Sequence, residues 1–334
     1  MSEDREYVSD KLFTLKDASD SARMRRVLEP ELPHLLGPGC QLAALDIQVL
    51  RRRKQRCVLR YRLQGPDGTG TPRAVSLIGK VYKADAGEAV TQLMRLLWDA
   101  GFDRQAPDRI AIPEVAAYLP RLSLLLQEEI GGVPVKEHLG LETGERALRQ
   151  MAVALAKLHR APVRPGEVFT LQDHLRRCHP RPQVLRDRCP ELRDAIDSIL
   201  QETAQLEKSY GGFEPALIHG DFHMGQVHVA PEHTWIIDFD ACCVADPAAD
   251  LGNVLVFLKG KARKVRDAER LAAAFVDEYC KHMPADVLRR VPLFEAVTHL
   301  RRACKRLRFE DDGWRKKARK FIDDSLDSLA AAAG

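Results

Sequence analysis

The stretch LIHGDFHMGQVHVAPEHTWIIDFD, residues 217–240, decides the fold class, because it concentrates aspartate, histidine and amide side chains around two short apolar runs. Asp221 lies in a polar turn next to Gly220, and Gln226 opens the apolar alternation QVHV. Asp238 ends the second apolar run, WII. The two runs predict short strands joined by a hairpin, which would bring the three polar side chains together.

The chemistry of these three side chains suits a divalent cation and a hydroxyl group. Carboxylate and amide oxygens are both ligands that magnesium accepts, so Gln226 and one aspartate can bind the same ion. The remaining carboxylate can then accept a proton from a hydroxyl. Together with a lysine on a separate strand for the phosphates of a nucleotide, these are the parts that phosphoryl transfer requires.

Four motifs occur in an order that resembles a known family, over roughly residues 45–260. They are LAKLHRAPV, HGDFHMGQ, IIDFD and DPAADLGN, and they resemble the aminoglycoside phosphotransferase superfamily of small-molecule kinases. The resemblance implies ATP and Mg²⁺ as cofactors and a small-molecule acceptor with a hydroxyl group as substrate. The variant HGDxHxGQ is similar to the maltokinase and glucosamine kinase branches, which indicates a sugar or amino sugar.

The family fold implied by this resemblance is that of the protein kinases. We therefore expect an α+β, two-lobed protein-kinase-like fold. Residues 1–128 would form a small N-lobe with an antiparallel sheet, and residues 129–334 a larger, mainly helical C-lobe. The Gly-Gly break that follows the apolar stretch RLSLLLQEEI is the candidate boundary between the lobes.

The resemblance also assigns roles in the C-lobe. Asp221 would be the catalytic base and Asp238 the main magnesium ligand. Gln226 stands where the family usually has asparagine, and its longer side chain still presents an amide oxygen to the metal. This departure supports a rival hypothesis, in which the chain is a catalytically weak, kinase-shaped nucleotide-binding or regulatory protein.

The first half of the chain alternates as half-buried strands do. Residues 56–63 and 73–82 predict a hairpin around the turn GPDGTGTP, and the second strand carries Lys80. A helix should follow, because one stripe at helical spacing is apolar and Gly101 provides a stop. The members of that stripe are Val90, Leu93, Met94 and Leu97.

By resemblance, the N-lobe binds the nucleotide. Lys80 would bind its phosphates, with Lys83 as a solvated rival, and Glu88 is the obvious acidic partner for Lys80. The backbone from Gln127 to Ile130 would be the hinge that binds adenine, with Glu128 and Ile130 as the contacts.

A second departure from the family lies in the phosphate loop. Where the family uses a glycine-containing loop, this chain has RRRKQR, residues 51–56. Basic side chains would have to supply the charge there, because no glycine lets backbone amides close on a phosphate. This departure also supports the rival hypothesis.

The second half of the chain is expected to be mainly helical. The stretch ETGERALRQMAVALAKLHRAPV predicts a helix that ends before Pro162, and residues 161–190 read as loop or insertion. Helix resumes over 191–209 and again after Asp250. Asp250 is expected mainly as the N-cap of a helix closed by Gly260, and only secondarily as a support for the catalytic loop.

Other polar clusters have structural readings that we favour. His219 is expected to be a packed structural histidine, and a zinc site built from His223, His228, His233 and Asp221 lacks a tight ligand cluster. The acidic stretch FEDDGW, residues 309–314, could hold an amino sugar, but a helix cap or loop is the simpler interpretation. The basic stretch HLRRACKRLRFE predicts a solvated amphipathic helix with Leu300, Cys304 and Leu307 inward.

Composition excludes several classes of protein. A hydrophobic content of 45% with 30% charged residues is typical of a soluble enzyme and argues against a membrane protein. The acidic start MSEDREYVSD does not resemble a signal peptide, so we expect a cytoplasmic protein. The net charge of +4 gives no reason to expect nucleic acid as a partner. Eight cysteines without CxxC spacing are expected to be buried free thiols.

Overall fold

The computed structural model describes residues 12–53, 56–84, 86–261 and 267–333. The chain divides into two compact units, Met1–Gly131 and Gly132–Gly334. The division falls within the Gly-Gly break, which follows the expected end of the N-lobe at residue 128. Each unit has its own hydrophobic core.

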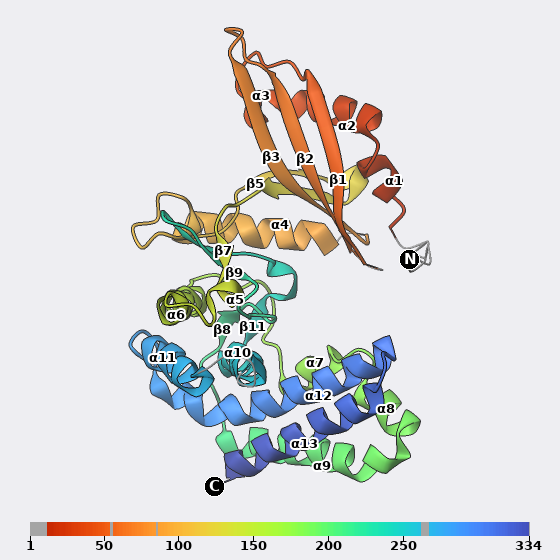
Figure 1. Ribbon diagram of the computed structural model, residues 1–334, viewed down its shortest axis with the longest axis vertical. Coiled ribbons are helices and arrows are strands. Elements are labelled where there is room, and N and C mark those ends of the chain that lie inside the picture. Colours follow the sequence, from red (N-terminus) through yellow and green to blue (C-terminus); the bar gives the residue numbers. More distant parts are fainter. Residues whose placement is uncertain (1–11, 54–55, 85, 262–266, 334) are drawn as a thin grey trace. The chain divides into compact units, whose positions relative to one another are not determined.

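The N-terminal unit is built on a five-stranded antiparallel sheet with the order β1-β2-β3-β6-β5 (Figure 1). The predicted hairpin is confirmed, since β2 and β3 pair from Arg56↔Tyr82 to Pro66↔Pro72. The edge strand β1, which the sequence analysis did not predict, pairs with β2. The strands are β1 (Ala44–Arg52), β2 (Arg56–Pro66), β3 (Pro72–Tyr82), β5 (Val115–Leu119) and β6 (Leu124–Glu128), with a short β4 (Ile110–Ala111) outside this sheet.

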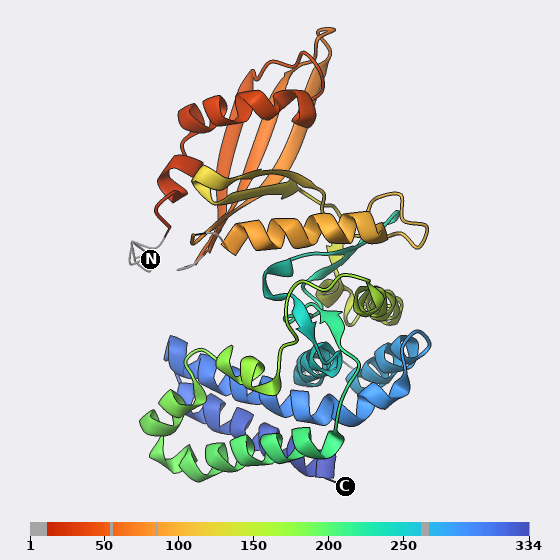
Figure 2. The same cartoon turned by 180° about the vertical axis from the view of Figure 1, so that it is seen from behind.

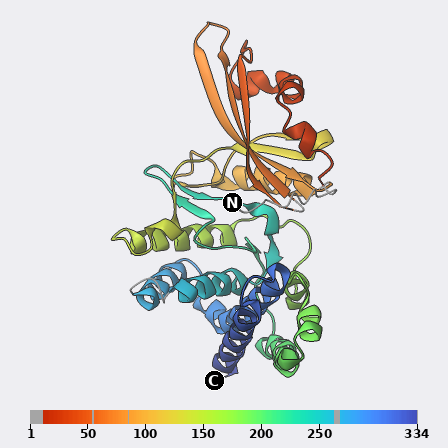
Figure 3. The same ribbon diagram turned by 45° about the vertical axis from the view of Figure 1, so that its right-hand side comes forward.

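Three short helices cover one face of this sheet: α1 (Leu15–Ala18), α2 (Ser21–Leu28) and α3 (Leu32–Leu35) (Figures 2 and 3). The alternation of β2 turns Leu59 and Tyr61 toward them, and both side chains are fully buried in the shared core. The hydroxyl of Tyr61 donates a hydrogen bond to the carbonyl oxygen of Ala18 over 2.6 Å. This bond ties the end of α1 to the sheet.

Helix α4 (Ala86–Leu97) packs against the sheet and confirms the predicted apolar stripe. Val90, Leu93, Met94 and Leu97 are all buried. The helix runs into a wider turn, Trp98–Phe102, where Gly101 has φ of 88° and ends the helical path.

The C-terminal unit is mainly helical and also contains short strands (Figure 1). Its strands form two small antiparallel groups, in which β9 pairs with both β7 and β10 and β8 pairs with β11. The strands are β7 (Val133–Pro134), β8 (Ala216–Ile218), β9 (Val227–Val229), β10 (Thr234–Ile236) and β11 (Cys243–Ala245). The helices are α5 (Val135–His138), α6 (Gly144–Arg160), α7 (Leu171–Arg176), α8 (Pro182–Arg188), α9 (Arg193–Tyr210), α10 (Ala248–Lys261), α11 (Ala268–Cys280), α12 (Val291–Phe309) and α13 (Trp314–Ala333).

Two expectations for this unit were wrong. Residues 161–190 are not only loop, because α7 and α8 lie within them. Asp250 is not a helix N-cap, because α10 begins at Ala248 and Gly260 lies within it. Asp246 has the capping position instead, and its Oδ1 accepts a hydrogen bond from the N–H of Ala248 over 2.9 Å.

The two long C-terminal helices confirm the structural readings of the basic and acidic stretches. Leu300, Cys304 and Leu307 are buried on α12. The acidic stretch forms the connection to α13, where Lys317 pairs with Asp311 over 3.0 Å and Arg188 pairs with Glu310 over 3.2 Å. The eight cysteines are free thiols, as predicted, but Cys40, Cys242 and Cys280 are only partly buried. No helix in the described ranges is long and apolar enough to cross a membrane.

Replacing Tyr61 by phenylalanine should destabilise the protein by about 1–3 kcal/mol, because the buried carbonyl of Ala18 loses its partner. Tyr210 offers a matched control, since its buried hydroxyl has no hydrogen-bond partner within the described part of the chain. Tyr210→Phe should change the stability by less than about 0.5 kcal/mol. Urea unfolding of both variants measures the difference, and equal stabilities would show that the Tyr61 bond contributes nothing.

Candidate active site

The segment between β8 and β9, residues 219–226, carries most of the polar groups predicted from the sequence. We call it the catalytic loop. The N–H of Ile237, directly after β10, donates to the carbonyl of Gln226 over 2.9 Å. This bond brings the end of the catalytic loop next to the residue that follows Ile237, which is Asp238.

Gln226 and Asp238 therefore lie together. The amide nitrogen of Gln226 is 3.3 Å from Oδ2 of Asp238, and the side chain of Gln226 is buried. Asp238 has a left-handed backbone, with φ of 71° and ψ of 61°. A residue other than glycine adopts this conformation at a cost, and aspartate and asparagine tolerate it better than most residues.

This pair fits a magnesium ion by the chemistry of its donors. The carboxylate of Asp238 and the amide of Gln226 are within hydrogen-bond distance, so both could contact one cation if the amide presents its oxygen. The oxygen and nitrogen of such an amide are assigned from the surrounding hydrogen bonds, and a flip exchanges them. The longer side chain of Gln226 thus does not prevent it from approaching the aspartate.

Asp221 has a different environment from Asp238. Its side chain is 50% exposed, and Oδ1 lies 4.0 Å from a guanidinium nitrogen of Arg301. Within the described ranges its carboxylate accepts no hydrogen bond. An exposed carboxylate with open acceptor positions is suited to taking a proton from an incoming hydroxyl.

A buried carboxylate, Asp250, holds the start of the catalytic loop. Its two oxygens accept the N–H groups of His219 over 2.6 Å and Gly220 over 2.9 Å. Nε2 of His159 lies 3.3 Å from Oδ2, and because an ionised carboxylate can only accept, this nitrogen carries the proton. Nδ1 of His159 shares a 2.7 Å hydrogen bond with the hydroxyl of Tyr279.

These contacts determine the charge of Asp250. Burial alone would raise its pKa, but the hydrogen bonds from His159 and from the backbone of His219 outweigh burial and hold the pKa below its usual range. Asp250 is therefore ionised at neutral pH and keeps its two backbone partners in place.

One face of α10 follows the catalytic loop residue by residue. Asp250 binds its first two amides, and the amide nitrogen of Asn253 donates to the carbonyl of Phe222 over 2.7 Å. The ring of Phe257 lies 5.2 Å from that of His223, between centroids. These three residues have the spacing i, i+3, i+7 of a single helical stripe. Helix α10 thus fixes the conformation of the loop.

His219 and His223 both make hydrogen bonds within the region. His219 is fully buried, and its Nε2–H donates to the carbonyl of Ile237 over 2.9 Å, as predicted for a packed histidine. Nδ1 of His223 accepts the N–H of Gly225 over 2.9 Å, so it carries no proton. Burial also lowers the pKa of His223. No cluster of three or more metal-binding side chains occurs among the described residues, and nothing supports the zinc alternative.

The N-terminal unit contains the predicted lysine in a buried position. Lys80 is 6% exposed on β3, whereas Lys83 is exposed. Lys80 pairs with Leu125 and Ile78 pairs with Gln127 across β3 and β6, so Lys80 and Gln127 share a face of the sheet. The side-chain oxygen of Gln127 is buried and has no hydrogen-bond partner in the described part of the structure.

Other predicted residues of this unit are not gathered around Lys80. Glu88 is exposed in the first turn of α4, and the described residues include no ion pair between it and Lys80. The carboxylate of Glu128 pairs with Arg104. The N–H of Ile130 makes no hydrogen bond to any described residue. Within the predicted phosphate loop, residues 54–55 lie outside the described residues.

Sequence reasoning missed the groups that support the site from a distance. His159 and Asn253 lie within the motifs LAKLHRAPV and DPAADLGN, so the signal was present without an assigned role. Arg301 lies on α12 and had no signal beyond its place in a basic stretch. Its guanidinium donates to the side-chain oxygen of Asn253 over 2.5 Å, which holds it beside Asp221.

An aspartate–amide pair beside the catalytic loop and a buried lysine on a strand are among the parts that phosphoryl transfer requires. The sequence matches the phosphotransferase enzyme family (APH) over residues 58–293. The chain therefore belongs to this family and is a small-molecule phosphotransferase that acts on hydroxyl groups. No curated protein sequence matches the chain at a significant level.

Solved structures confirm the predicted α+β, two-lobed kinase-like fold. A choline kinase from Cryptosporidium parvum is 13% identical, with a TM-score of 0.62 over 93% of this chain and 96% of that chain. The aminoglycoside phosphotransferase APH(4)-Ia is 16% identical, with a TM-score of 0.61 over 94% and 100%. A spectinomycin phosphotransferase solved with ADP and spectinomycin is 16% identical, with a TM-score of 0.53 over 92% and 98%.

Replacing Gly220 by alanine should disrupt the catalytic loop. Gly220 has φ of +76°, and a Cβ atom there would lie 2.3 Å from the carbonyl oxygen of Ala241. We expect a loss of about 1–3 kcal/mol in the free energy of unfolding. Gly212→Ala is the control, because a Cβ atom there meets nothing within 4 Å. Denaturant unfolding of the two variants checks the prediction, which fails if both retain the stability of the parent.

Proposed function

We propose that this protein is an ATP-dependent kinase that transfers the γ-phosphate to a hydroxyl group of a small cytoplasmic metabolite, a sugar or amino sugar. The observation that carries the proposal is the arrangement of the catalytic loop. Asp221 stands open to solvent, while Gln226 and Asp238 lie 3.3 Å apart at the other end of the same loop. Membership of the phosphotransferase family supports this assignment.

Asp221 acts as the base that orients and deprotonates the acceptor hydroxyl. Its open carboxylate can accept a hydrogen bond from the hydroxyl, which positions the oxygen for attack. The fixed loop supports this role, because Asp250 and Asn253 hold the backbone on both sides of Asp221. Positioning of this kind is a large part of what a protein contributes to phosphoryl transfer.

Asp238 and Gln226 would hold Mg²⁺, which would supply positive charge to offset that of the nucleotide phosphates. The left-handed backbone of Asp238 sets the direction in which its side chain leaves the chain. The hydrogen bond between Ile237 and Gln226 keeps the two ligands together.

The N-terminal unit would bind ATP through Lys80 and the chain that follows β6. A buried ammonium group on a strand is suited to phosphate oxygens. The buried oxygen of Gln127 can accept from an amino group, and the open N–H of Ile130 can donate to a ring nitrogen. Glu128 lies between Gln127 and Ile130 in the chain, so the hinge that binds adenine would be the segment from Gln127 to Ile130. The ADP in the spectinomycin phosphotransferase structure supports a purine nucleotide.

A coupled ADP-release screen over sugars and amino sugars tests the proposal, with mass spectrometry to detect a product that has gained one phosphate. We expect at least one acceptor to give Mg²⁺-dependent ADP release and a phosphorylated product. Silence over the whole panel would favour the rival hypothesis, a kinase-shaped nucleotide-binding protein in which Gln226 weakens the metal site.

Asp221→Asn should lower kcat by about 10²–10⁴-fold, because an amide cannot accept the proton of the acceptor hydroxyl. The KM for ATP and the Mg²⁺-dependent thermal shift with ATP should not change, since Asp221 holds neither nucleotide nor metal. Steady-state kinetics of the parent and the variant make the comparison. A variant with parental kcat would remove Asp221 from the reaction.

Asp238→Asn should abolish Mg²⁺-dependent turnover and leave the fold intact. Asparagine tolerates the left-handed backbone at this position, but it lacks the charge that binds a divalent cation. Asp240→Asn, two residues further along and exposed, is the matched control and should keep full turnover. Magnesium titrations of activity and circular dichroism spectra test both variants. Retained activity in Asp238→Asn would place the metal on other residues.

A further inference from the structure

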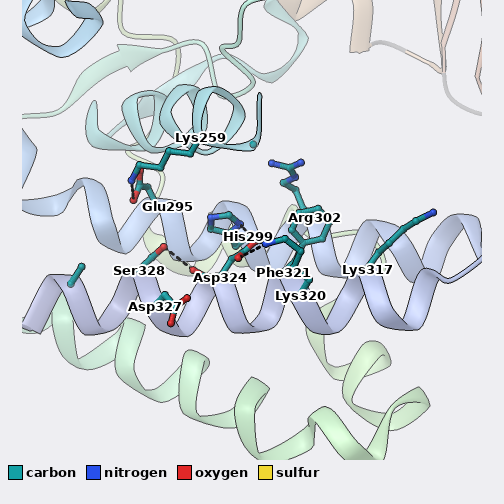
Figure 4. Close-up of a pocket in the computed structure, with 12 residues that line it drawn as sticks. Lys259, Glu295, His299, Arg302, Lys317, Lys320, Phe321, Asp324, Asp327 and Ser328 are labelled. Carbon is teal, nitrogen blue, oxygen red and sulfur yellow. Dashed lines mark hydrogen bonds and ion pairs between the residues drawn. The ribbon is translucent and has the colours of Figure 1, made fainter. Parts of the chain in front are cut away.

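An open hollow lies at the meeting of α10, α12 and α13 in the C-terminal unit (Figure 4). Its volume is about 510 Å³, which is enough for a small polar metabolite. Basic side chains reach it from all three helices: Lys259 from α10, Arg302 from α12, and Lys317 and Lys320 from α13.

Three of these cations have carboxylate partners. Lys259 pairs with Glu295 over 2.7 Å, Lys320 with Asp324 over 2.6 Å, and Lys317 with Asp311 over 3.0 Å. Their charges are largely compensated within the protein.

Arg302 differs from its neighbours because it has no carboxylate partner in the described part of the chain. Among the described residues its hydrogen bonding is limited to a long contact of 3.5 Å to the carbonyl of Val256. The guanidinium instead lies across two aromatic rings, 4.5 Å from the centre of Phe321 and 5.0 Å from that of Phe257. In Figure 4 its head group points from α12 toward α10, into the hollow.

This environment disfavours an uncompensated cation. Burial lowers the pKa of Arg302, with smaller contributions from neighbouring charges, although a guanidinium stays protonated at neutral pH. The aromatic rings compensate part of the charge and hold the plane of the guanidinium in one orientation. A planar guanidinium held in this way can donate two parallel hydrogen bonds to a carboxylate or phosphate.

The hollow is linked to the catalytic loop through Phe257. This ring contacts Arg302 on one side and the ring of His223 on the other, and His223 is two residues from Asp221. The preceding arginine, Arg301, lies 4.0 Å from Asp221 itself. Arg301 therefore lies beside the base and Arg302 in the hollow, and because Arg302 has no carboxylate partner among the described residues, its charge would favour an anionic group there.

We propose that the acceptor carries an oxyanion, a carboxylate or a phosphate, in addition to the hydroxyl that is phosphorylated, and that Arg302 binds this group in the hollow. The acceptor class is then a sugar acid or a sugar phosphate. This inference rests on the proposed function, and it narrows the acceptor from sugars in general to anionic sugars.

The first experiment compares four acceptors of similar size in the ADP-release assay: glucose, glucosamine, glucuronate and glucose 6-phosphate. We expect kcat/KM to be at least about tenfold higher for an anionic acceptor than for the neutral or cationic one, as one charge-assisted hydrogen bond allows. The glucuronate and glucose 6-phosphate arms decide between carboxylate and phosphate. Preference for glucose or glucosamine would overturn the inference and leave the proposed kinase function intact.

The second experiment examines Arg302→Gln, with Arg308→Gln as the matched control on an exposed position of the same helix. In Arg302→Gln the KM for the anionic acceptor should rise by about 10- to 100-fold, while kcat and the KM for ATP stay as in the parent. Arg302→Lys, which keeps the charge and loses the planar fork, should give an intermediate KM. Parental KM values in Arg302→Gln would overturn the assignment.

A binding measurement separates failure of this inference from failure of the proposed function. Calorimetric titration with glucose 6-phosphate and with glucuronate, without nucleotide, needs no turnover. We expect one of them to bind the parent and Arg308→Gln at least about tenfold more tightly than Arg302→Gln. If one of these anions binds in this way but no acceptor gives ADP release, the proposed kinase function is refuted and the anion site is retained. Absence of binding to the parent, or equal binding to Arg302→Gln, would refute the anion site.

Discussion

The buried carboxylate of Asp250 is the interaction on which the catalytic loop depends. It accepts two successive backbone amides, those of His219 and Gly220, and receives a third hydrogen bond from His159. A buried charge is tolerated only when its hydrogen-bonding capacity is satisfied, and leaving a buried polar group without its partner costs about 1–3 kcal/mol, more when the group is charged. The loop conformation that exposes Asp221 thus depends on Asp250, which is distant in the sequence and takes no part in the reaction itself.

The support for Asp250 extends through several helices. His159 lies on α6 and Tyr279 on α11, and their 2.7 Å hydrogen bond connects both helices to the carboxylate on α10. All three side chains are buried and satisfy one another. Polar networks of this kind are stable only as a whole, because an unpaired member in a region of low dielectric constant is costly. The packing of these helices and the conformation of the catalytic loop therefore depend on each other.

Much of the fold and part of the site could be predicted from the sequence, because their signals are local. Alternation gave the hairpin that carries Lys80, and a short hairpin brings Gln226 and Asp238 together. The helices α7 and α8 were missed because their prolines were taken as loop signals, although Pro182 at the start of α8 is favoured there. Asp250 was assigned to a helix cap because a local pattern does not show which distant amides a carboxylate meets.

The remaining residues could not be predicted, because their roles depend on contacts between distant segments. The guanidinium of Arg301 lies beside Asp221, although the two residues are eighty positions apart in the chain. The guanidinium of Arg302 is held by aromatic rings from two other helices. No periodicity in the sequence relates such positions.

The single stripe of α10 that carries Asp250, Asn253 and Phe257 has an evolutionary consequence. Asp250 holds the catalytic loop near the start of α10, and about two helical turns further along the same helix approaches the hollow. Lys259, just beyond Phe257, lines the hollow and hydrogen-bonds to Glu295 rather than to the catalytic loop, so mutations there can change the acceptor that binds while Asp221 keeps its position. A helix arranged in this way allows the acceptor specificity to change during evolution with little effect on kcat.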